Sequence, residues 1–254
     1  MKSTCFSLVI AATVMLAAGG AVCAAEMDDQ IVAAFNNSYV SRTYLKDDAI
    51  QVKCRNGVVT LSGAVADENH KSLAQETAAS LPGVNSVDNQ LISKIDRATE
   101  KEDARIARHA KITLLYHRNV SAKTGVEVKD GMVTLTGEAA SQAQKELTAE
   151  YVKDIKGVKG VKNEMTVAAV PVPPEQPLSA KIDDASISAQ VKMTLMSRRA
   201  TSALRTKVST ENGVVTLSGT AANAAEKELA AKLVGDINGV SNVVNNMTIE
   251  PMSK

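Results

Sequence analysis

The chain has few aromatic residues and few cysteines. Phe, Trp and Tyr make up 2% of its 254 residues, and tryptophan is absent. Its core must therefore be built from aliphatic side chains and alanine. Three cysteines, two of them within the first 23 residues, exclude a disulfide framework as the source of stability. The three histidines, His70, His109 and His117, are too widely spaced for the three or four converging ligands of a zinc site.

A strong charge of one sign is also absent. The net charge of +1 gives no electrostatic argument for a nucleic-acid partner. The sequence contains no phosphate-binding loop of the Walker or dinucleotide type, and no recurring Ser, His and Asp set. It also has no recurring inward pair of acids for proton transfer. We therefore expect no enzyme, no catalytic residues, no metal and no cofactor.

The one pronounced apolar run lies at the N-terminus, from Phe6 to Ala18, ahead of "VCA" at 22–24. The run is short for a bilayer span and predicts a signal peptide over 1–24. A retained anchor and a lipoprotein cleaved before Cys23 are the alternatives, but Val22 and Gly20 fit a lipoprotein signal poorly. After cleavage Cys54 is the only cysteine, and we expect it to face inward as a small apolar side chain, not as a redox group.

One octapeptide recurs along the chain. "NGVVTLSG" stands at 56–63 and 212–219, and "DGMVTLTG" stands at 130–137. At one constant offset from each copy follow "LPGVNSV", "IKGVKGV" and "INGVSNV". Three sets of glycines therefore recur in register: Gly57, Gly131 and Gly213; Gly63, Gly137 and Gly219; Gly83, Gly157 and Gly239. Equal offsets without gaps indicate three copies of one unit.

Each glycine set has a physical interpretation. Asn-Gly or Asp-Gly between β-rich runs predicts a hairpin, because both turn residues need positive φ. The glycine that closes the octapeptide falls on the apolar face, where we expect a helix to approach closely. The third set follows a helical pattern, and we expect it to cap that helix. The repeated octapeptide is thus a folding device.

Helical stripes flank each hairpin. The first begins at Ile31, Ile106 or Ile187, with an acid three residues earlier (Asp28, Asp103, Asp184), which suits a helix N-terminus. A third strand, returning across the second helix, should pair in parallel with the hairpin. The predicted fold class is α+β: three tandem αββαβ modules, each a three-stranded mixed sheet with two helices on one face.

The predicted modules span 26–97, 100–169 and 180–251. A proline-rich linker at 170–179 separates the last two. An extended spacer of this kind predicts that the third module is the most independent, whereas the first two are closely coupled.

The hairpin motif, the helix after it and the pattern "GVxxVxN" in Gly83–Asn89, Gly157–Asn163 and Gly239–Asn245 resemble the BON domain. The resemblance covers nearly the whole chain after residue 24. It implies an αββαβ fold, a periplasmic location and a non-enzymatic role in osmotic or envelope stress. It also implies peripheral contact with anionic phospholipid surfaces or, alternatively, with unfolded envelope proteins as a chaperone, and a potassium-responsive module is a third alternative.

Basic residues gather in the second copy. Residues 104–126 contain no acid, and such a helix can lie on an anionic bilayer, gaining about 1 kcal/mol per basic residue. An ordinary solvated face is the alternative. The lipid-surface candidates are Arg105, Arg108, Lys111, Leu115, Tyr116 and Arg118. Asn89, Asn163 and Asn245 stand in apolar stripes, where we expect their amides to satisfy backbone groups, not a ligand.

Overall fold

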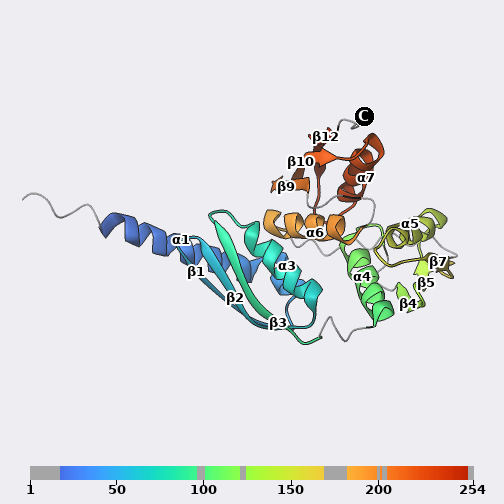
Figure 1. Ribbon diagram of the computed structural model, residues 1–254, viewed down its shortest axis with the longest axis horizontal. Coiled ribbons are helices and arrows are strands. Elements are labelled where there is room, and N and C mark those ends of the chain that lie inside the picture. The colour runs from blue at the N-terminus through green and yellow to red at the C-terminus, as the bar shows by residue number, and fades with distance from the viewer. Residues whose placement is uncertain are drawn as a thin grey trace, which may run out of the picture.

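A computed structural model describes residues 18–95, 101–120, 124–168, 182–198, 201 and 205–250 (Figure 1). The predicted signal peptide lies outside these residues except at 18–24, where the first helix begins. The predicted linker at 170–179 lies outside them altogether. Within the described residues, no helix is long and apolar enough to span a membrane.

The first module contains three helices and one three-stranded sheet. Its elements are α1 (Ala18–Asn37), α2 (Tyr39–Thr43), β1 (Ala49–Arg55), β2 (Val58–Val65), α3 (Glu68–Ala79) and β3 (Ser86–Ser93). Strand β2 is central: β1 pairs with it antiparallel and β3 pairs with it in parallel. The parallel return strand predicted from the sequence is present.

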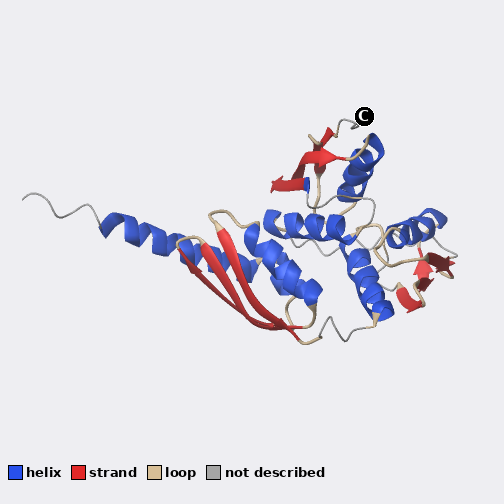
Figure 2. Ribbon diagram, viewed as in Figure 1, coloured by secondary structure: helices blue, strands red, loops and turns tan. Residues whose placement is uncertain are grey.

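The second and third modules also place helices against a small sheet (Figure 2). They repeat the order helix, two strands, helix, strand, with the last strand divided in both and the middle strand divided in the second. The second has α4 (Glu102–Tyr116), β4 (Gly125–Lys129), β5 (Met132–Thr136), β6 (Glu138–Ala139), α5 (Gln142–Lys153), β7 (Gly160–Asn163) and β8 (Thr166–Val167). The third has α6 (Asp184–Ser197), β9 (Thr206–Glu211), β10 (Val214–Ala221), α7 (Ala224–Gly235), β11 (Asn242–Asn245) and β12 (Thr248–Ile249). The fold is therefore α+β, with three repeated modules.

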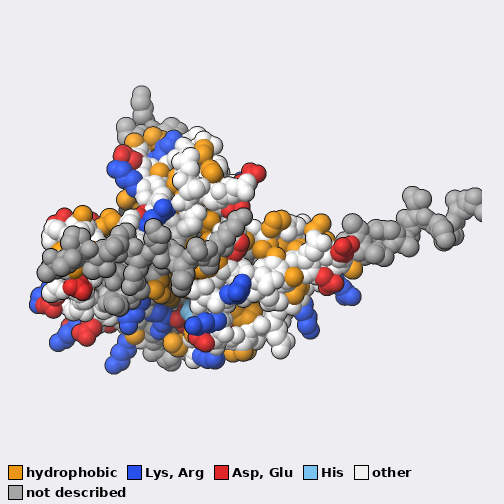
Figure 3. Space-filling model, turned by 180° about the vertical axis from the view of Figure 1, so that it is seen from behind, with side chains coloured by type: hydrophobic (Ala, Val, Ile, Leu, Met, Phe, Trp, Pro, Cys, Tyr) orange, Lys and Arg blue, Asp and Glu red, His pale blue; other side chains and the backbone are white. Residues whose placement is uncertain are grey.

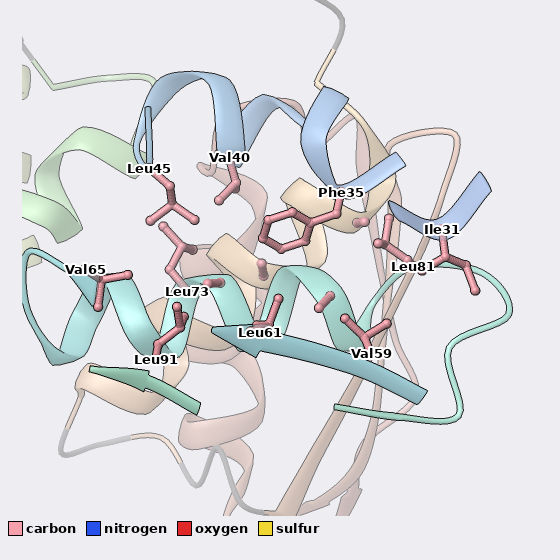
Figure 4. Close-up of a cluster of buried hydrophobic side chains, with 14 of the residues drawn as sticks. Ile31, Phe35, Val40, Leu45, Val59, Leu61, Val65, Leu73, Leu81 and Leu91 are labelled. Carbon is pink, nitrogen blue, oxygen red and sulfur yellow. The ribbon is translucent and has the colours of Figure 1, made fainter. Parts of the chain in front are cut away.

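The helices cover one face of each sheet, and the central strand explains why. In β2, Val59 and Leu61 are fully buried, whereas Val58 between the turn and Val59 is 41% exposed. Side chains alternate between the two faces of a strand, so only one face can join the core. Figure 4 shows the result in the first module, where Phe35 of α1 and Leu73 of α3 meet Leu61.

Each hairpin turn is held by a carboxylate. Both Oδ atoms of Asp28 accept backbone N–H groups, from Asn56 at 2.7 Å and Gly57 at 2.9 Å. The same pair of bonds joins Asp103 to the second turn and Asp184 to the third. All three aspartates thus bind turns, but only Asp103 and Asp184 also stand in the first turn of a helix as predicted, because α1 begins ten residues before Asp28.

The glycine that closes the octapeptide makes room for a strand, not for the predicted helix. Gly63 has a φ of +113°, and a Cβ there would lie 1.9 Å from the carbonyl oxygen of Ala49 in β1. Gly219 faces Arg205 in the same way, at 2.0 Å. All nine recurring glycines have positive φ.

Close approach by a helix occurs instead at the third set of glycines. Gly157 lies four residues beyond the end of α5, so it is not the residue that caps this helix. A Cβ on Gly157 would lie 2.9 Å from Ile106 of α4. Gly239 meets Ile187 of α6 at 3.0 Å in the same manner. These glycines allow the first helix of a module to pack against the turn before its last strand.

The third module is not independent, contrary to the expectation from its linker. Helix α6 lies between the other modules (Figure 1) and contacts both α3 and α4. Its N-terminal Asp183 accepts the N–H of Tyr39 at 2.7 Å, and Ser186 Oγ accepts that of Val40 at 3.0 Å. The proline content of a linker predicts the conformation of the linker itself. It does not predict whether the modules that the linker joins have surfaces that pack together.

Candidate functional site at the junction of the modules

Tyr116, one of the predicted lipid-surface residues, is instead buried. It is 2% exposed and belongs to the core of the first module, although it ends α4 of the second. Its ring meets that of Tyr44 edge-on at 5.3 Å. Burial raises the pKa of Tyr116 above its usual value. Tyr116 therefore joins two modules and is not available to a membrane.

Two of the predicted basic residues also bind neighbouring modules. Arg108 Nε lies 3.1 Å from Asp67, the N-cap of α3. Arg118 Nη2 donates to three carbonyl oxygens around the end of α7, those of Gly235, Ile237 and Val240, at 2.7–3.1 Å. Carbonyl groups at a helix C-terminus lack intrahelical partners and favour a cation.

Two of the other three candidates, Lys111 and Leu115, remain exposed, and Arg105 is partly buried. Arg105 pairs with Glu102 at 3.3 Å, and the Glu102 side chain is 70% exposed. Lys111 is exposed, and Leu115, one turn later on α4, is 48% exposed. The structure thus divides the six candidates into an exposed flank (Lys111 and Leu115), the partly buried Arg105 beside it, and a docking set (Arg108, Tyr116 and Arg118).

The second and third modules exchange equivalent contacts. His117, just after α4, forms an antiparallel bridge with Ile237 after α7. Ile155, just after α5, forms the same bridge with Arg198 after α6. The flanking hydrogen bonds also correspond: Asn238 N to Tyr116 O at 2.9 Å, and Lys156 N to Ser197 O at 3.1 Å. Because each module gives and receives the same contact, the junction has approximate two-fold symmetry, as in an isologous dimer.

A buried polar cluster lies beside this exchange. The ring of His117 stacks on Tyr151 at 3.8 Å, and its Nδ1 lies 3.6 Å from Asp236 Oδ2. The Tyr151 hydroxyl donates to Asp236, and the guanidinium of Arg198 lies 5.8 Å from the Tyr151 ring.

Burial governs the charges of this cluster. It lowers the pKa of His117 below its usual value, and the nearby charge of Arg198 acts in the same direction, although Asp236 opposes both. Burial also lowers the pKa of Arg198 to about 10, against the attraction of Asp154. At neutral pH the cluster therefore holds a neutral imidazole and a charged guanidinium.

A cavity of about 270 Å³ opens where all three modules meet. Its walls come from α3, α4, α6 and the turn after α5. Its cationic side chains are Arg105, Arg108 and Lys156, and Glu68 is the one carboxylate among the residues that line it. Ile112, Met193 and Met196 supply apolar surface. On the face shown in Figure 3, Lys and Arg side chains gather low in the middle, next to a histidine.

The other residues singled out from the sequence have local roles. Cys54 is partly buried, and its thiol donates to Asp28 at 3.1 Å. Burial raises the pKa of Cys54 to about 11, so the unreactive thiol dominates at neutral pH. His70 lies 2.6 Å from Asp48. Across the described part of the chain, no three His, Cys, Asp or Glu side chains gather as a metal would require.

The three recurring asparagines act on the backbone, as expected. Asn163 Nδ2 donates to the carbonyl oxygen of Lys145 in α5 at 2.6 Å, and its Oδ1 accepts the N–H of Met165 at 3.2 Å. Asn89 and Asn245 make the corresponding bonds. Each asparagine ties the last strand of its module to the second helix.

Sequence reasoning missed the junction itself. The bridges at His117 and Arg198 join residues that share no sequence motif, so no pattern in either module predicts them. The binding of each turn by an aspartate was also missed, and there a signal was available: the aspartate stands 28 or 29 residues before the glycine of its Asn-Gly or Asp-Gly pair.

Comparisons with known proteins relate this chain to one family. The osmotically-inducible protein Y of Escherichia coli (strain K12) is 28% identical over 160 residues, which are 61% of this chain and 78% of that protein. Two solved structures of CdsD, a structural protein of the type III secretion system of Chlamydia trachomatis, each cover 84% of this chain. Their identities are 17% and 19%, with TM-scores of 0.25 and 0.21. The BON domain matches at residues 27–94, 102–169 and 183–251, so the chain belongs to the BON domain family.

Proposed function

We propose that this chain is a non-enzymatic osmotic and envelope-stress protein of the periplasm that contacts anionic phospholipid surfaces from outside the bilayer. Membership of the BON family and the osmotically-inducible relative support the stress role. The apolar run from Phe6 to Ala18, typical of an export signal, supports the location.

The exposed flank of α4 carries the lipid contact. Lys111 has no carboxylate within ion-pair distance among the described residues, and Leu115 lies on the same side of the helix. Arg105 adds a second basic group whose partner, Glu102, is largely exposed. A basic helix flank with an exposed leucine suits a surface that offers both anionic head groups and apolar chains.

Vesicle flotation of the full chain tests this contact. We expect flotation with phosphatidylglycerol vesicles at low salt and little with phosphatidylcholine alone, because the attraction is electrostatic. The double variant Lys111→Glu, Leu115→Glu should reduce the bound fraction about tenfold, since it inverts a charge and removes the apolar contact. Lys207→Glu on β9 is the matched control and should leave flotation unchanged. Binding that is insensitive to salt, or equal for the two variants, would reject the proposal.

Client binding is a second candidate, favoured by the open sheet faces. Each sheet carries helices on one face, and apolar side chains remain on the other. In the first module these are Val58 at 41% and Ile92 at 70% exposed, in the second Met132 at 46% and in the third Val244 at 38%. Three similar faces on one chain offer weak, repeated contacts to an unfolded segment.

Suppression of aggregation separates this candidate from lipid contact. The full chain in excess should keep an unfolded outer-membrane protein in solution, and Ile92→Lys with Met132→Lys should weaken that effect. No suppression at tenfold excess would set the candidate aside. The potassium-responsive alternative predicts a higher melting temperature in potassium than in sodium at equal ionic strength.

A further inference from the structure

We propose that the cavity between the three modules binds the phosphate head of a small amphiphile. The choice of a phospholipid head group as its natural source rests on the proposed function. The chemistry of the ligand follows from the side chains that line the cavity.

The charge of the lining selects an anion. Arg105, Arg108 and Lys156 line the cavity with one acid, Glu68. Arg105 and Arg108 also pair with Glu102 and Asp67, which do not line it, so Lys156 is the cation that decides the preference. Lys156 Nζ donates to a neutral group, the carbonyl oxygen of Met196 at 3.1 Å, and has no carboxylate partner in the described chain. Two guanidinium groups and an ammonium suit a phosphate, whose several oxygens accept forked and single donors together.

Helix α3 also reaches the cavity, but a carboxylate already caps its N-terminus. It begins at Glu68, and Glu68 and Asn69 of its first turn line the cavity. The N-terminus of a helix carries a partial positive charge. Asp67 already accepts two N–H groups of this turn and lies against Arg108, so its negative charge is partly offset within the protein.

The size and the apolar wall limit the ligand. A volume of about 270 Å³ lies just below the ~300–1,000 Å³ of sites for drug-sized molecules, so it fits a head group with a short extension. Ile112, Met193 and Met196 would contact that extension, and methionine side chains adapt to irregular shapes. A phosphate on a glycerol or a short alkyl chain meets both requirements.

A ligand bound in the cavity would also stabilise the docked arrangement of the three modules. The cavity exists only while α3, α4 and α6 are docked, because each module supplies part of its wall. A ligand that binds the docked arrangement and not the separated modules must stabilise docking.

Calorimetric titration of the full chain with soluble compounds tests the cavity apart from any membrane. Octyl phosphate should bind more tightly than sn-glycerol 3-phosphate, and the uncharged octyl glucoside should not bind. Lys156→Gln should weaken octyl phosphate at least tenfold, whereas Lys159→Gln, an exposed lysine on the same turn that does not line the cavity, should leave affinity unchanged. Ser72→Phe, which fills the cavity without changing charge, should abolish binding.

No binding at millimolar octyl phosphate, or equal binding by the Lys156 and Lys159 variants, would overturn the inference. Binding retained by Ser72→Phe would do the same, with circular dichroism confirming that each variant is folded. Vesicle flotation of the Lys111 and Leu115 double variant is independent, because neither residue lines the cavity. Octyl phosphate binding without flotation would support the cavity and reject membrane contact, and flotation without octyl phosphate binding would do the reverse.

Discussion

The aspartate that binds each hairpin turn is the smallest device repeated in the three modules. Each turn contains a residue other than glycine with positive φ: Asn56 at 51°, Asp130 at 52° and Asn212 at 51°. Such conformations are uncommon for side-chain-bearing residues and need support from their surroundings. The carboxylate supplies it by accepting two adjacent N–H groups at once. These bonds, first that from Gly57, hold the pKa of Asp28 below its usual value.

Replacing one of these aspartates should destabilise the fold. We expect Asp184→Ala to lower the free energy of unfolding by about 1–3 kcal/mol, because two N–H groups of the turn lose a charged acceptor. Urea denaturation followed by circular dichroism measures the change. Asp29→Ala, an exposed acid on α1, is the control and should have little effect. An Asp184 variant as stable as the control would show that the turn needs no carboxylate.

The stacked histidine at the junction predicts a pH dependence. The folded protein holds the pKa of His117 below the value of about 6.5 that it has when unfolded. Below pH 6.5 the unfolded chain therefore binds more protons than the folded one, and stability falls as pH drops. His117→Phe keeps a ring against Tyr151 but cannot titrate. The urea midpoint of the variant should fall less between pH 7.5 and 5 than that of the parent chain, and parallel curves would contradict the assignment.

Among the elements, α6 is the one that organises the molecule. Its apolar stripe of Ile187, Val191 and Leu195 enters the core of the third module. Its opposite side, with Ala185 and Ala189, enters the core of the first. Lys192 forms an ion pair with Glu76 of α3 at 3.1 Å beside that contact. A helix buried on two sides needs small residues on one of them, because a second helix must come close.

Enlarging this small side should therefore weaken the docking of the first and third modules. Ala189 is fully buried, and Ala189→Leu should cost about 1–3 kcal/mol through overpacking. Ala104→Leu makes the same change at an exposed site on α4 and should be nearly neutral. Equal denaturation midpoints for the two variants would show that the contact between α3 and α6 accommodates the larger side chain without loss of stability.

The modules were predictable from sequence and their docking was not. Asn-Gly and Asp-Gly turns, period-two strands and helical stripes are local patterns, so strand order and the repeat follow from them. Ala185 and Ala189 carry no such pattern, since alanine suits a buried contact and a solvated helix equally. Tyr116 was misplaced for a related reason: an aromatic residue at the end of a basic helix resembles a membrane anchor until its partner Tyr44 is known.

At the scale of the whole molecule, the cores are shared between modules. The core of the first includes Tyr116 from the second and Ala189 from the third, and that of the second includes Leu233 from the third. Removing any one module would expose apolar surface on the others. We therefore expect the three modules to unfold as one cooperative unit and not independently of one another.

Calorimetric melting tests this cooperativity. We expect a single transition for the full chain, with a van't Hoff enthalpy near the calorimetric one, because each core depends on a neighbour. Arg118→Ala removes the side chain that binds the end of α7 and should broaden or split the transition. Three separate transitions in the parent chain would contradict the shared cores.

The matching bridges at His117 and Arg198 have a consequence for how such a chain can arise and change. In an isologous contact both partners use the same surface, so two identical subunits can form it. Duplication and fusion of a gene for a dimeric ancestor would therefore preserve the contact without requiring a new interface. Once fused, the pair no longer depends on protein concentration, and the two sides are free to diverge. The two equivalent positions now differ in charge, because at neutral pH His117 carries a neutral imidazole and Arg198 a charged guanidinium.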